Sequence, residues 1–392
     1  MKGWKVRQLT FPSEAGHAHS HSYYDIPVID GASRRVLVHR LSFAGRHPTP
    51  KDEITVGVVD LDRPKSFTPL GRSRAWSWQQ GPMAQWVAGG PWAVWNDRGP
   101  DGFIARLVNA ESGEARRLDR SVYAVTPDGL TALSLDMARL DHLRPGYGYP
   151  VPELTLAGRW PGKSGVWAVP LDGGGAPRLI LSIRSAVAWL MRQLPLLDVA
   201  GHLRRRFYYW FNHAKISPDG QRFTVKLRWR RKGRGWSDRQ GVSLTANLDG
   251  GDLRLLTDAT SHVIWQDEAR LYLWRHDRMV LLKDTAPRGT VLGQIGAEAI
   301  DANVHLRHLP PGPTASPETY VFDTPYREDV TLNLLAAETG EATRIAAFSG
   351  HVPARGPFRC DLHPCPSADG RRIVVTSPQS GARQVYVVDR TG

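Results

Sequence analysis

The sequence predicts an all-β fold built from repeated four-stranded units, and two recurring patterns predict it. The first is a tight turn before an alternating strand: Ser-Pro-Asp-Gly at 217–220 precedes 221–230, where apolar and polar residues alternate. Similar turns precede alternating stretches after Gly31, Gly129 and Gly370. The second pattern is a later hairpin with a small polar turn, as in 171–180 and 246–256. Together they describe one blade of a β-propeller, repeated along the chain.

The spacing of these turns predicts seven blades in a single domain, 1–392. Between Gly31 and Gly129 there is room for two blades, and between Gly220 and Gly370 for three. The interval from Gly129 to Gly220 fits one blade plus an insertion, 139–206, that carries a loop and an amphipathic helix between blades three and four. We expect residues 1–20 to supply an outer strand that closes the ring against the strand at 384–389.

Composition limits the classes of partner. The net charge of +13 favours an acidic partner. No zinc-finger, RNA-recognition or basic-helix pattern is present, so an anionic glycan is expected rather than nucleic acid. Two cysteines, no apolar leader and no run of 18 apolar residues indicate a cytoplasmic protein without a membrane span, or a secreted one if a leader was trimmed. The sequence does not set the oligomeric state.

Two polar stretches are candidates for substrate binding. Residues 73–98 are rich in Trp and amide side chains, and Gln79 and Asn96 there can bind sugar hydroxyls. The alternative for Trp76, Trp78 and Trp86 is that they fill the wedge-shaped cores between blades. The loop 137–150 concentrates titratable and donor groups, namely Arg139, His142, Arg144, Tyr147 and Tyr149. The following segment, 181–203, has helical apolar spacing that ends near Pro195, and we expect it to be a lid or a packing accessory.

Histidines recur at one position when the blades are aligned on their turns. His213, His305 and His363 each lie seven residues before a turn glycine (Gly220, Gly312 and Gly370), and His262 lies three before Trp265. Blades four to seven therefore each open their innermost strand with a histidine. Since these strands surround the central channel, we expect four imidazoles at one mouth. A further run, His17, His19 and His21, would supply metal ligands or line the same mouth.

The spacing Cys360-x-x-His363 suits a divalent ion such as zinc. Asp361 and His363 alternate and can face the same way, and His262 from another blade would complete a set of three or four ligands. We therefore predict a divalent metal, Zn, Mn or Ca, held by His262, Cys360, Asp361 and His363. The remaining histidines would stay free as acid or base.

Short motifs along most of the chain resemble the seven-bladed propeller polysaccharide lyases, that is, the oligogalacturonate and ulvan lyases. They are Trp-Phe-Asn-His at 210–213 before Ser-Pro-Asp-Gly, Ser-His-Val-Ile-Trp at 261–265, Cys-Asp-Leu-His-Pro at 360–364, and Arg-Gln-Val-Tyr at 383–386. The resemblance implies that His213 is the base. It also implies a metal, typically manganese, held by His262 and by a Gln-x-x-His-x-His run that reads Phe358, Asp361 and His363 here.

On the ulvan-lyase side, the resemblance implies a histidine pair acting with Tyr and Arg, near Tyr123 and His142. The expected reaction is β-elimination on a uronic-acid glycan, with C5 proton abstraction and loss of the C4 oxygen. The base is His213 or His142, the acid is Tyr147 or Tyr149, and the carboxylate is neutralised by Arg139, Arg144 or Arg228. His21, His305 and Arg383 join the substrate-binding set.

Two other functions compete with a lyase. One is a non-catalytic propeller that binds a glycan or a protein. The other is a glycoside hydrolase, which needs two carboxylates at one mouth, with Asp25, Asp97, Asp141 and Asp361 available.

Overall fold

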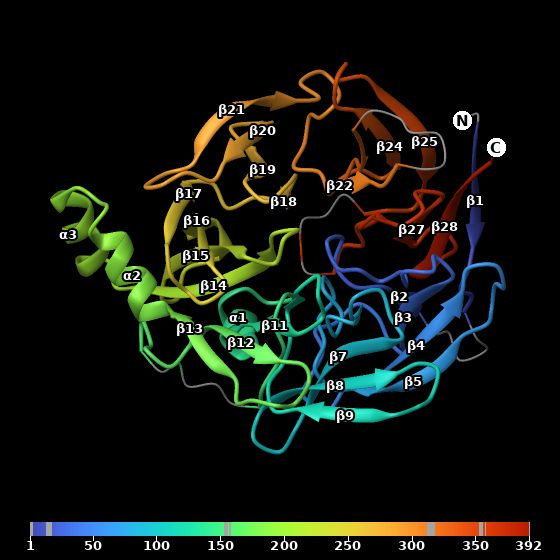
Figure 1. The fold of residues 1–392 in the computed structure, drawn as a ribbon, viewed down its shortest axis with the longest axis horizontal. Coiled ribbons are helices and arrows are strands. Elements are labelled where there is room, and N and C mark those ends of the chain that lie inside the picture. Colours follow the sequence, from blue (N-terminus) through green and yellow to red (C-terminus); the bar gives the residue numbers. More distant parts are fainter. Residues whose placement is uncertain are drawn as a thin grey trace.

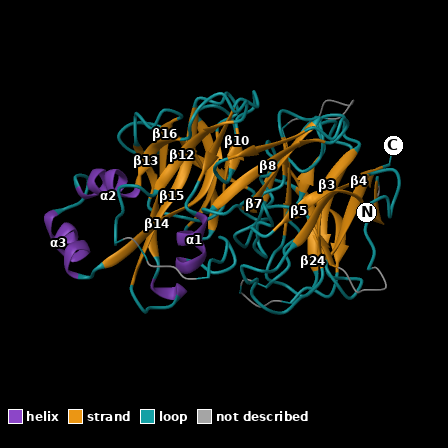
Figure 2. Cartoon of the chain, turned by 90° about the horizontal axis from the view of Figure 1, so that it is seen from below, coloured by secondary structure: helices purple, strands orange, loops and turns teal. Residues whose placement is uncertain are grey.

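The chain closes into a seven-bladed β-propeller, as predicted. The computed structural model describes residues 3–12, 18–152, 156, 158–311, 318–352, 356 and 358–391, so His17 and Gly312 of the sequence patterns lie outside it. The described strands form seven four-stranded antiparallel sheets arranged around a central axis (Figures 1 and 2). In six of them the strands follow chain order from the axis outwards.

The first three blades come from the N-terminal half of the chain. Blade one contains β2 (Ala18–Ser20), β3 (Arg35–Leu41), β4 (Ile54–Asp60) and β5 (Thr68–Ser73). Blade two contains β6 (Gln85–Trp86), β7 (Trp92–Arg98), β8 (Phe103–Asn109) and β9 (Ala115–Leu118). Blade three contains β10 (Ala124–Val125), β11 (Thr131–Ser134), β12 (Gly165–Pro170) and β13 (Arg178–Ser182).

The next three blades follow the same order. Blade four contains β14 (Phe207–Ile216), β15 (Arg222–Arg231), β16 (Gln240–Asn247) and β17 (Arg254–Thr257). Blade five contains β18 (Val263–Trp265), β19 (Arg270–Arg275), β20 (Arg278–Lys283) and β21 (Thr290–Ile295). Blade six contains β22 (Leu306–Leu309), β23 (Thr319–Asp323), β24 (Val330–Ala336) and β25 (Ala342–Phe348).

Blade seven joins the two ends of the chain. Its strands are β26 (Cys365–Pro366), β27 (Arg372–Ser377), β28 (Gln384–Arg390) and, outermost, β1 (Trp4–Gln8). β1 pairs antiparallel with β28 from Trp4↔Arg390 to Gln8↔Tyr386, which confirms the predicted closure (Figure 1). β1 thus covers the outer edge of β28, and its backbone hydrogen bonds hold the two ends of the chain together.

The recurring turn works through its own side chains. In blade four, Ser217 Oγ lies 2.6 Å from Asp219 Oδ1 and accepts from Arg222 N at 2.9 Å. Gly220 takes the left-handed conformation, with φ of +73°. The same bonds recur at Ser367 and Asp369 in blade seven. Local hydrogen bonding therefore sets the position of each turn, and that is why the motif was visible in the sequence.

The predicted insertion 139–206 is two separate insertions. Helix α1 (Met137–Leu143) and the loop after it lie within blade three, between β11 and β12. Helices α2 (Ile183–Met191) and α3 (Leu196–Arg204) lie between blades three and four and project from the rim (Figure 1). β12 and β13, which belong to the sheet of blade three, separate the two insertions. The predicted helix, expected to end near Pro195, is α2, which ends at Met191; Pro195 is the N-cap residue of a second helix, α3.

The tryptophans of the segment 73–98 fill the cores between blades. Trp76 and Trp86 are 1% exposed and Trp78 is 6% exposed. The indole nitrogens donate to backbone carbonyls, that of Trp86 to Val28 at 3.0 Å for example. These residues are therefore packing groups rather than a sugar platform. No helix within the described residues is long and apolar enough to cross a membrane.

Candidate active site at one mouth of the channel

His213 sits on a bulge in the innermost strand of blade four. β14 begins at Phe207, so His213 lies within the strand and does not open it, contrary to the expectation from sequence. The pairing of β14 with β15 shifts between Asn212 and Lys215, and His213 adopts a φ of +54°. A bulge of this kind re-aims a side chain. His363 also takes a positive φ, +48°, ahead of β26.

The four predicted histidines meet around Tyr23. The centroid of the Tyr23 ring lies 5.1 Å from that of His213, 6.4 Å from His262, 5.9 Å from His305 and 4.7 Å from His363. The rings of His262 and His305 are 4.2 Å apart, and those of His305 and His363 are 4.6 Å apart. Ring closure therefore brings together imidazoles from four blades, as expected from their common position.

A cavity of about 400 Å³ opens beside these rings. His213 and His262 contribute to its wall, while His305 and His363 are not part of the lining. Trp236 also lines it, in the short 3₁₀ helix η1 (Trp236–Asp238). The lining is strongly cationic: five basic side chains face two carboxylates, Asp277 and Asp301. The five are Arg144, Lys226, Arg228, Arg239 and Arg359.

Two of these cations come from the polar side of β15: Lys226, and Arg228, which was expected to neutralise the carboxylate. Lys226 is 1% exposed and Arg228 is 5% exposed. Burial, together with Arg228, Lys215 and Arg144, lowers the pKa of Lys226 well below 10.5. Burial, with Arg144 and Arg239, likewise lowers the pKa of Arg228. Lys226 and Arg228 have no ion pair with a carboxylate among the described residues, and an anion in the cavity would relieve their repulsion.

His213 is neutral at pH 7 in this environment. The side chain is 2% exposed, and its Nδ1 lies 3.1 Å from the hydroxyl of Tyr123. Burial, reinforced by Lys226, Arg144 and other cations, lowers the pKa of His213 well below 6.5. Because Nδ1 faces Tyr123, Nε2 is the ring nitrogen left for a substrate. A neutral imidazole with one open nitrogen can accept a proton.

Tyr147 is the hydroxyl best suited to give a proton. It lines the cavity, and its ring centroid lies 5.7 Å from that of His213. Burial acts to raise the pKa of Tyr147, but Arg144 and Arg359 outweigh it, so the pKa is lowered from 10.0. The guanidinium of Arg144 lies over the ring at 3.6 Å, and Arg359 Nη2 donates to the hydroxyl at 3.1 Å.

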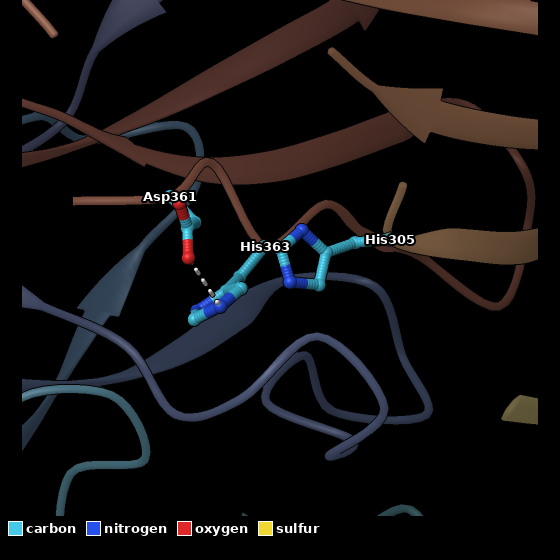
Figure 3. A group of neighbouring side chains, drawn as sticks. All are labelled: His305, Asp361 and His363. Atoms are coloured by element: carbon cyan, nitrogen blue, oxygen red, sulfur yellow. Dashed lines mark ion pairs between the residues drawn. The ribbon is translucent and has the colours of Figure 1, made fainter. Parts of the chain in front are cut away.

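A possible ligand set for a metal lies deeper, and consists of His305, Asp361 and His363 (Figure 3). One ligand atom from each lies within 4.8 Å of the other two, and Nε2 of both histidines is buried without a hydrogen-bond partner. His305 Nδ1 lies 2.8 Å from Asp323 Oδ2, which keeps the proton on Nδ1 and leaves Nε2 open. Two imidazole nitrogens and a carboxylate suit Zn²⁺ or Mn²⁺, so the residues fit the expected divalent cation.

This set differs from the predicted one at two positions. Cys360 is absent from it: the thiol points to the carbonyl of Thr376 at 3.7 Å, and burial raises its pKa to about 11. His262 is also outside it, with Nδ1 2.9 Å from the carbonyl oxygen of Val304. His305, expected to bind substrate, takes the place of His262. The histidines of neighbouring blades reach slightly different depths in the channel, and the spacing of residues along the sequence does not reveal those depths.

Several residues of the predicted site point elsewhere. Asn96 and Tyr149 are fully buried and bonded to each other at 2.7 Å, outside the cavity lining. Arg139 donates to the carbonyls of Tyr209, Gly158 and Arg159, and so ties the inserted loop to blade four. His142 is an exposed residue in the last turn of α1 and does not line the cavity either.

Three more residues that were predicted to bind substrate instead contact the backbone around the site. Gln79 Nε2 donates to the carbonyl of Arg359 at 2.9 Å, and Arg383 donates to the same carbonyl at 2.8 Å. Both therefore position Arg359. His21 is 3% exposed, with Nδ1 2.8 Å from the carbonyl of Ser22 and with its pKa lowered to about 4, chiefly by burial.

Comparison with known proteins places the fold. No protein-family model and no curated protein sequence matches the chain. Two solved oligogalacturonate lyases do match, each covering 98% of this chain and 93% of their own. One, in complex with manganese, has a TM-score of 0.59 at 15% identity, and the other, from Vibrio parahaemolyticus, has 0.57 at 12%. The likeness is one of fold. It confirms the expected resemblance to seven-bladed propeller lyases at that level.

Sequence reasoning missed six residues at or beside the cavity: Tyr23, Gln80, Lys226, Trp236, Arg239 and Arg359. Lys226 shares its side of β15 with Arg228, so the periodicity that marked the strand already placed the two together. The others lie in turns or short segments, and no pattern in the sequence marks them. Only the closed ring brings them close to His213 and the cavity.

Proposed function

We propose that the protein is a lyase that cleaves a uronic-acid glycan by β-elimination. The observation that carries the proposal is a buried, neutral imidazole, His213, in the wall of a cavity with five cations. A uronate binds such a cavity through its carboxylate. Its C5 proton becomes acidic only when that carboxylate is neutralised, which the same cations would accomplish.

In this mechanism each cavity residue has a separate role. Lys226 and Arg228 bind the carboxylate and stabilise the charge that develops on it as the C5–H bond breaks. His213 Nε2 accepts the C5 proton, and the electrons form the C4–C5 double bond as the C4–O bond breaks. Tyr147 gives its hydroxyl proton to the departing oxygen. The products are an unsaturated uronide and a new hydroxyl end. His142 and Tyr149, the other candidates from sequence, do not line the cavity.

A divalent cation at His305, Asp361 and His363 would add positive charge close to the four histidines. His305, with its proton held on Nδ1 by Asp323, and His363, neutral because burial lowers its pKa, are both in the form that binds metal. The manganese in one of the solved lyases supports a metal of this kind.

The carboxylates do not favour a glycoside hydrolase. None of Asp25, Asp97, Asp141 and Asp361 lines the cavity. Of the two that do, Asp301 is exposed and paired with Arg327. A two-carboxylate mechanism needs a facing acid and base across one bond, and the cavity offers a histidine and a tyrosine in those places.

The direct test is the ultraviolet absorbance of the unsaturated product. Purified protein is incubated, with and without added Mn²⁺ or Zn²⁺, with short galacturonate and rhamnose-uronate oligomers. The same sugars reduced at the carboxyl group serve as the neutral control. We expect absorbance to rise with an acidic glycan and not with its neutral form. No rise on any uronate glycan would count against the lyase.

Replacing Tyr147 with Phe should lower kcat about 100-fold, the lower range for loss of a general acid. The ring and its packing remain, so KM should change little. Tyr149→Phe is the matched control, since that hydroxyl bonds to Asn96 outside the cavity. Steady-state kinetics on both variants decides between the two tyrosines. Equal loss in both would remove Tyr147 from the mechanism.

Metal content should depend on the three deep ligands. We expect His305→Ala and His363→Ala to lose bound Mn²⁺ or Zn²⁺, as measured by elemental analysis after dialysis. Cys360→Ala should retain the metal, because its thiol bonds away from the set. The wild-type melting temperature should rise on addition of metal, and those of the histidine variants should not. Metal retained by His305→Ala but lost by Cys360→Ala would restore the ligand set expected from sequence.

A further inference from the structure

Behind His213 lies a buried chain of hydrogen-bonding groups that leads away from the cavity. Tyr123 is 1% exposed and Gln80 is fully buried. The hydroxyl of Tyr123 lies 3.1 Å from His213 Nδ1 and 2.5 Å from Gln80 Nε2. Gln80 Nε2 also lies 3.5 Å from His213 Nδ1. The Oε1 atom of Gln80 is buried with no hydrogen-bond partner.

The direction of these bonds determines what His213 can do. If the Gln80 amide donates to Tyr123, the phenol proton goes to His213 Nδ1, and the imidazole must carry its own proton on Nε2. That tautomer can only donate into the cavity. If the amide is turned by 180°, Oε1 accepts the phenol proton, and Tyr123 accepts a bond from Nδ1–H. Nε2 is then bare and can accept a proton.

We propose that Gln80 and Tyr123 are positioning residues that set the tautomer of His213, with Gln80 Oε1 turned towards the phenol in the active enzyme. This orientation gives the buried Oε1 a partner, and the amide nitrogen takes the position that Oε1 leaves. It rests on the proposed function only in requiring that His213 act as a base. Neither residue touches substrate, since neither lines the cavity.

The packing around His213 supports a single, fixed ring orientation. Tyr23 stacks on it with an interplanar angle of 18°, and Tyr147 meets it edge-on at 86°. The backbone at His213 is itself held in the left-handed region by the bulge. These two ring contacts hold His213 with Nδ1 towards Tyr123, so Tyr123 is the group that controls the proton on Nδ1.

The test reads the tautomer directly and does not depend on activity. Nitrogen-15 NMR of protein labelled at histidine, with His213→Gln used to assign the signal, distinguishes Nδ1–H from Nε2–H. We expect Nδ1–H in the wild type. In Tyr123→Phe, which removes the acceptor, Nε2–H should appear. Nε2–H in the wild type, or no change in Tyr123→Phe, would overturn the proposal.

Two substitutions of Gln80 separate hydrogen bonding from packing. Gln80→Glu keeps an acceptor for the phenol proton, so Nδ1–H should persist. Gln80→Met keeps the volume but offers no such acceptor, and the Nε2–H signal should grow. If the protein proves to be a lyase, kcat should fall about 10- to 100-fold in Gln80→Met and Tyr123→Phe, with KM steady, and recover in Gln80→Glu. Equal kcat losses in Glu and Met variants would indicate a packing role instead.

The two proposals fail in distinguishable ways. If Nδ1–H depends on Tyr123 but no uronate glycan is cleaved, the positioning role of Gln80 and Tyr123 stands and the lyase proposal fails. If lyase activity requires His213 but the wild type carries Nε2–H, the lyase proposal stands and the positioning role fails.

Discussion

His213→Gln is expected to lower kcat by about 10³-fold, within the range of 10²–10⁴ that a general base contributes. The amide fills similar space between Tyr23 and Tyr147 but cannot take up a proton at neutral pH. KM should change little, because the cations that bind the carboxylate remain in place. Steady-state kinetics by the absorbance assay measures both constants.

The pH profile of the wild type follows from the lowered pKa of His213. An imidazole must be neutral to accept a proton, and burial and nearby cations keep its pKa well below 6.5. kcat/KM should therefore hold steady as the pH falls from 7 through 6.5, and decline only below that lowered pKa. An acid limb centred at or above pH 6.5 would contradict the assignment.

His142→Gln is the matched control, since that side chain is exposed and outside the cavity. We expect it to keep full activity. Full activity in His213→Gln, or a loss in His142→Gln as deep as that in His213→Gln, would move the base to the inserted loop.

Lys226→Met should weaken substrate binding while stabilising the fold. The loss of one charge-assisted bond to the carboxylate, about 1.5–3 kcal/mol, corresponds to a rise in KM of about 10- to 100-fold. At the same time the substitution removes a buried cation that Arg228, Lys215 and Arg144 repel. Methionine fills the same space without that cost, so the free energy of unfolding should increase by roughly 1 kcal/mol or more.

Lys215→Met gives the matched contrast on the neighbouring strand. Lys215 is also buried, at 6% exposed against 1% for Lys226, but its ammonium lies 3.2 Å from Asp25 and 2.6 Å from the hydroxyl of Tyr24. Removing it leaves a carboxylate without its partner, so stability should fall. Urea denaturation measures the free energy of unfolding of both variants, which should rise in Lys226→Met and fall in Lys215→Met. A loss of stability in Lys226→Met would show that this cation is compensated in the folded protein.

Predictions from sequence succeeded where a feature is local. The turn at Ser217 and Asp219 forms through bonds within five residues, and it marked the blades. The alternation along 221–230 identified β15, which runs from Arg222 to Arg231. It did not separate a solvent-facing side from a channel wall, so Lys226 was not expected at the site, whereas Arg228, expected to neutralise the carboxylate, does line the cavity.

The site was partly predictable for the same reason. His213, His262, His305 and His363 share one position in their blades, so they meet at Tyr23 once the ring closes. Their individual roles depend on what each neighbouring blade supplies. Asp323 orients His305, and Tyr123 faces His213. The backbone carbonyl of Val304 holds His262.

By itself the sequence determined the repeat, the number of blades and the position of the histidines, because hydrogen bonds and side-chain alternation within a blade depend on near neighbours. Only the tertiary structure decided which histidine faces the deep ligand set, which tyrosine lines the cavity and which arginines tie loops to the scaffold. The physical reason is that these outcomes depend on contacts between blades. Such contacts are set by the bulge at His213, by the depth of each inner strand and by the closure of the ring between β1 and β28.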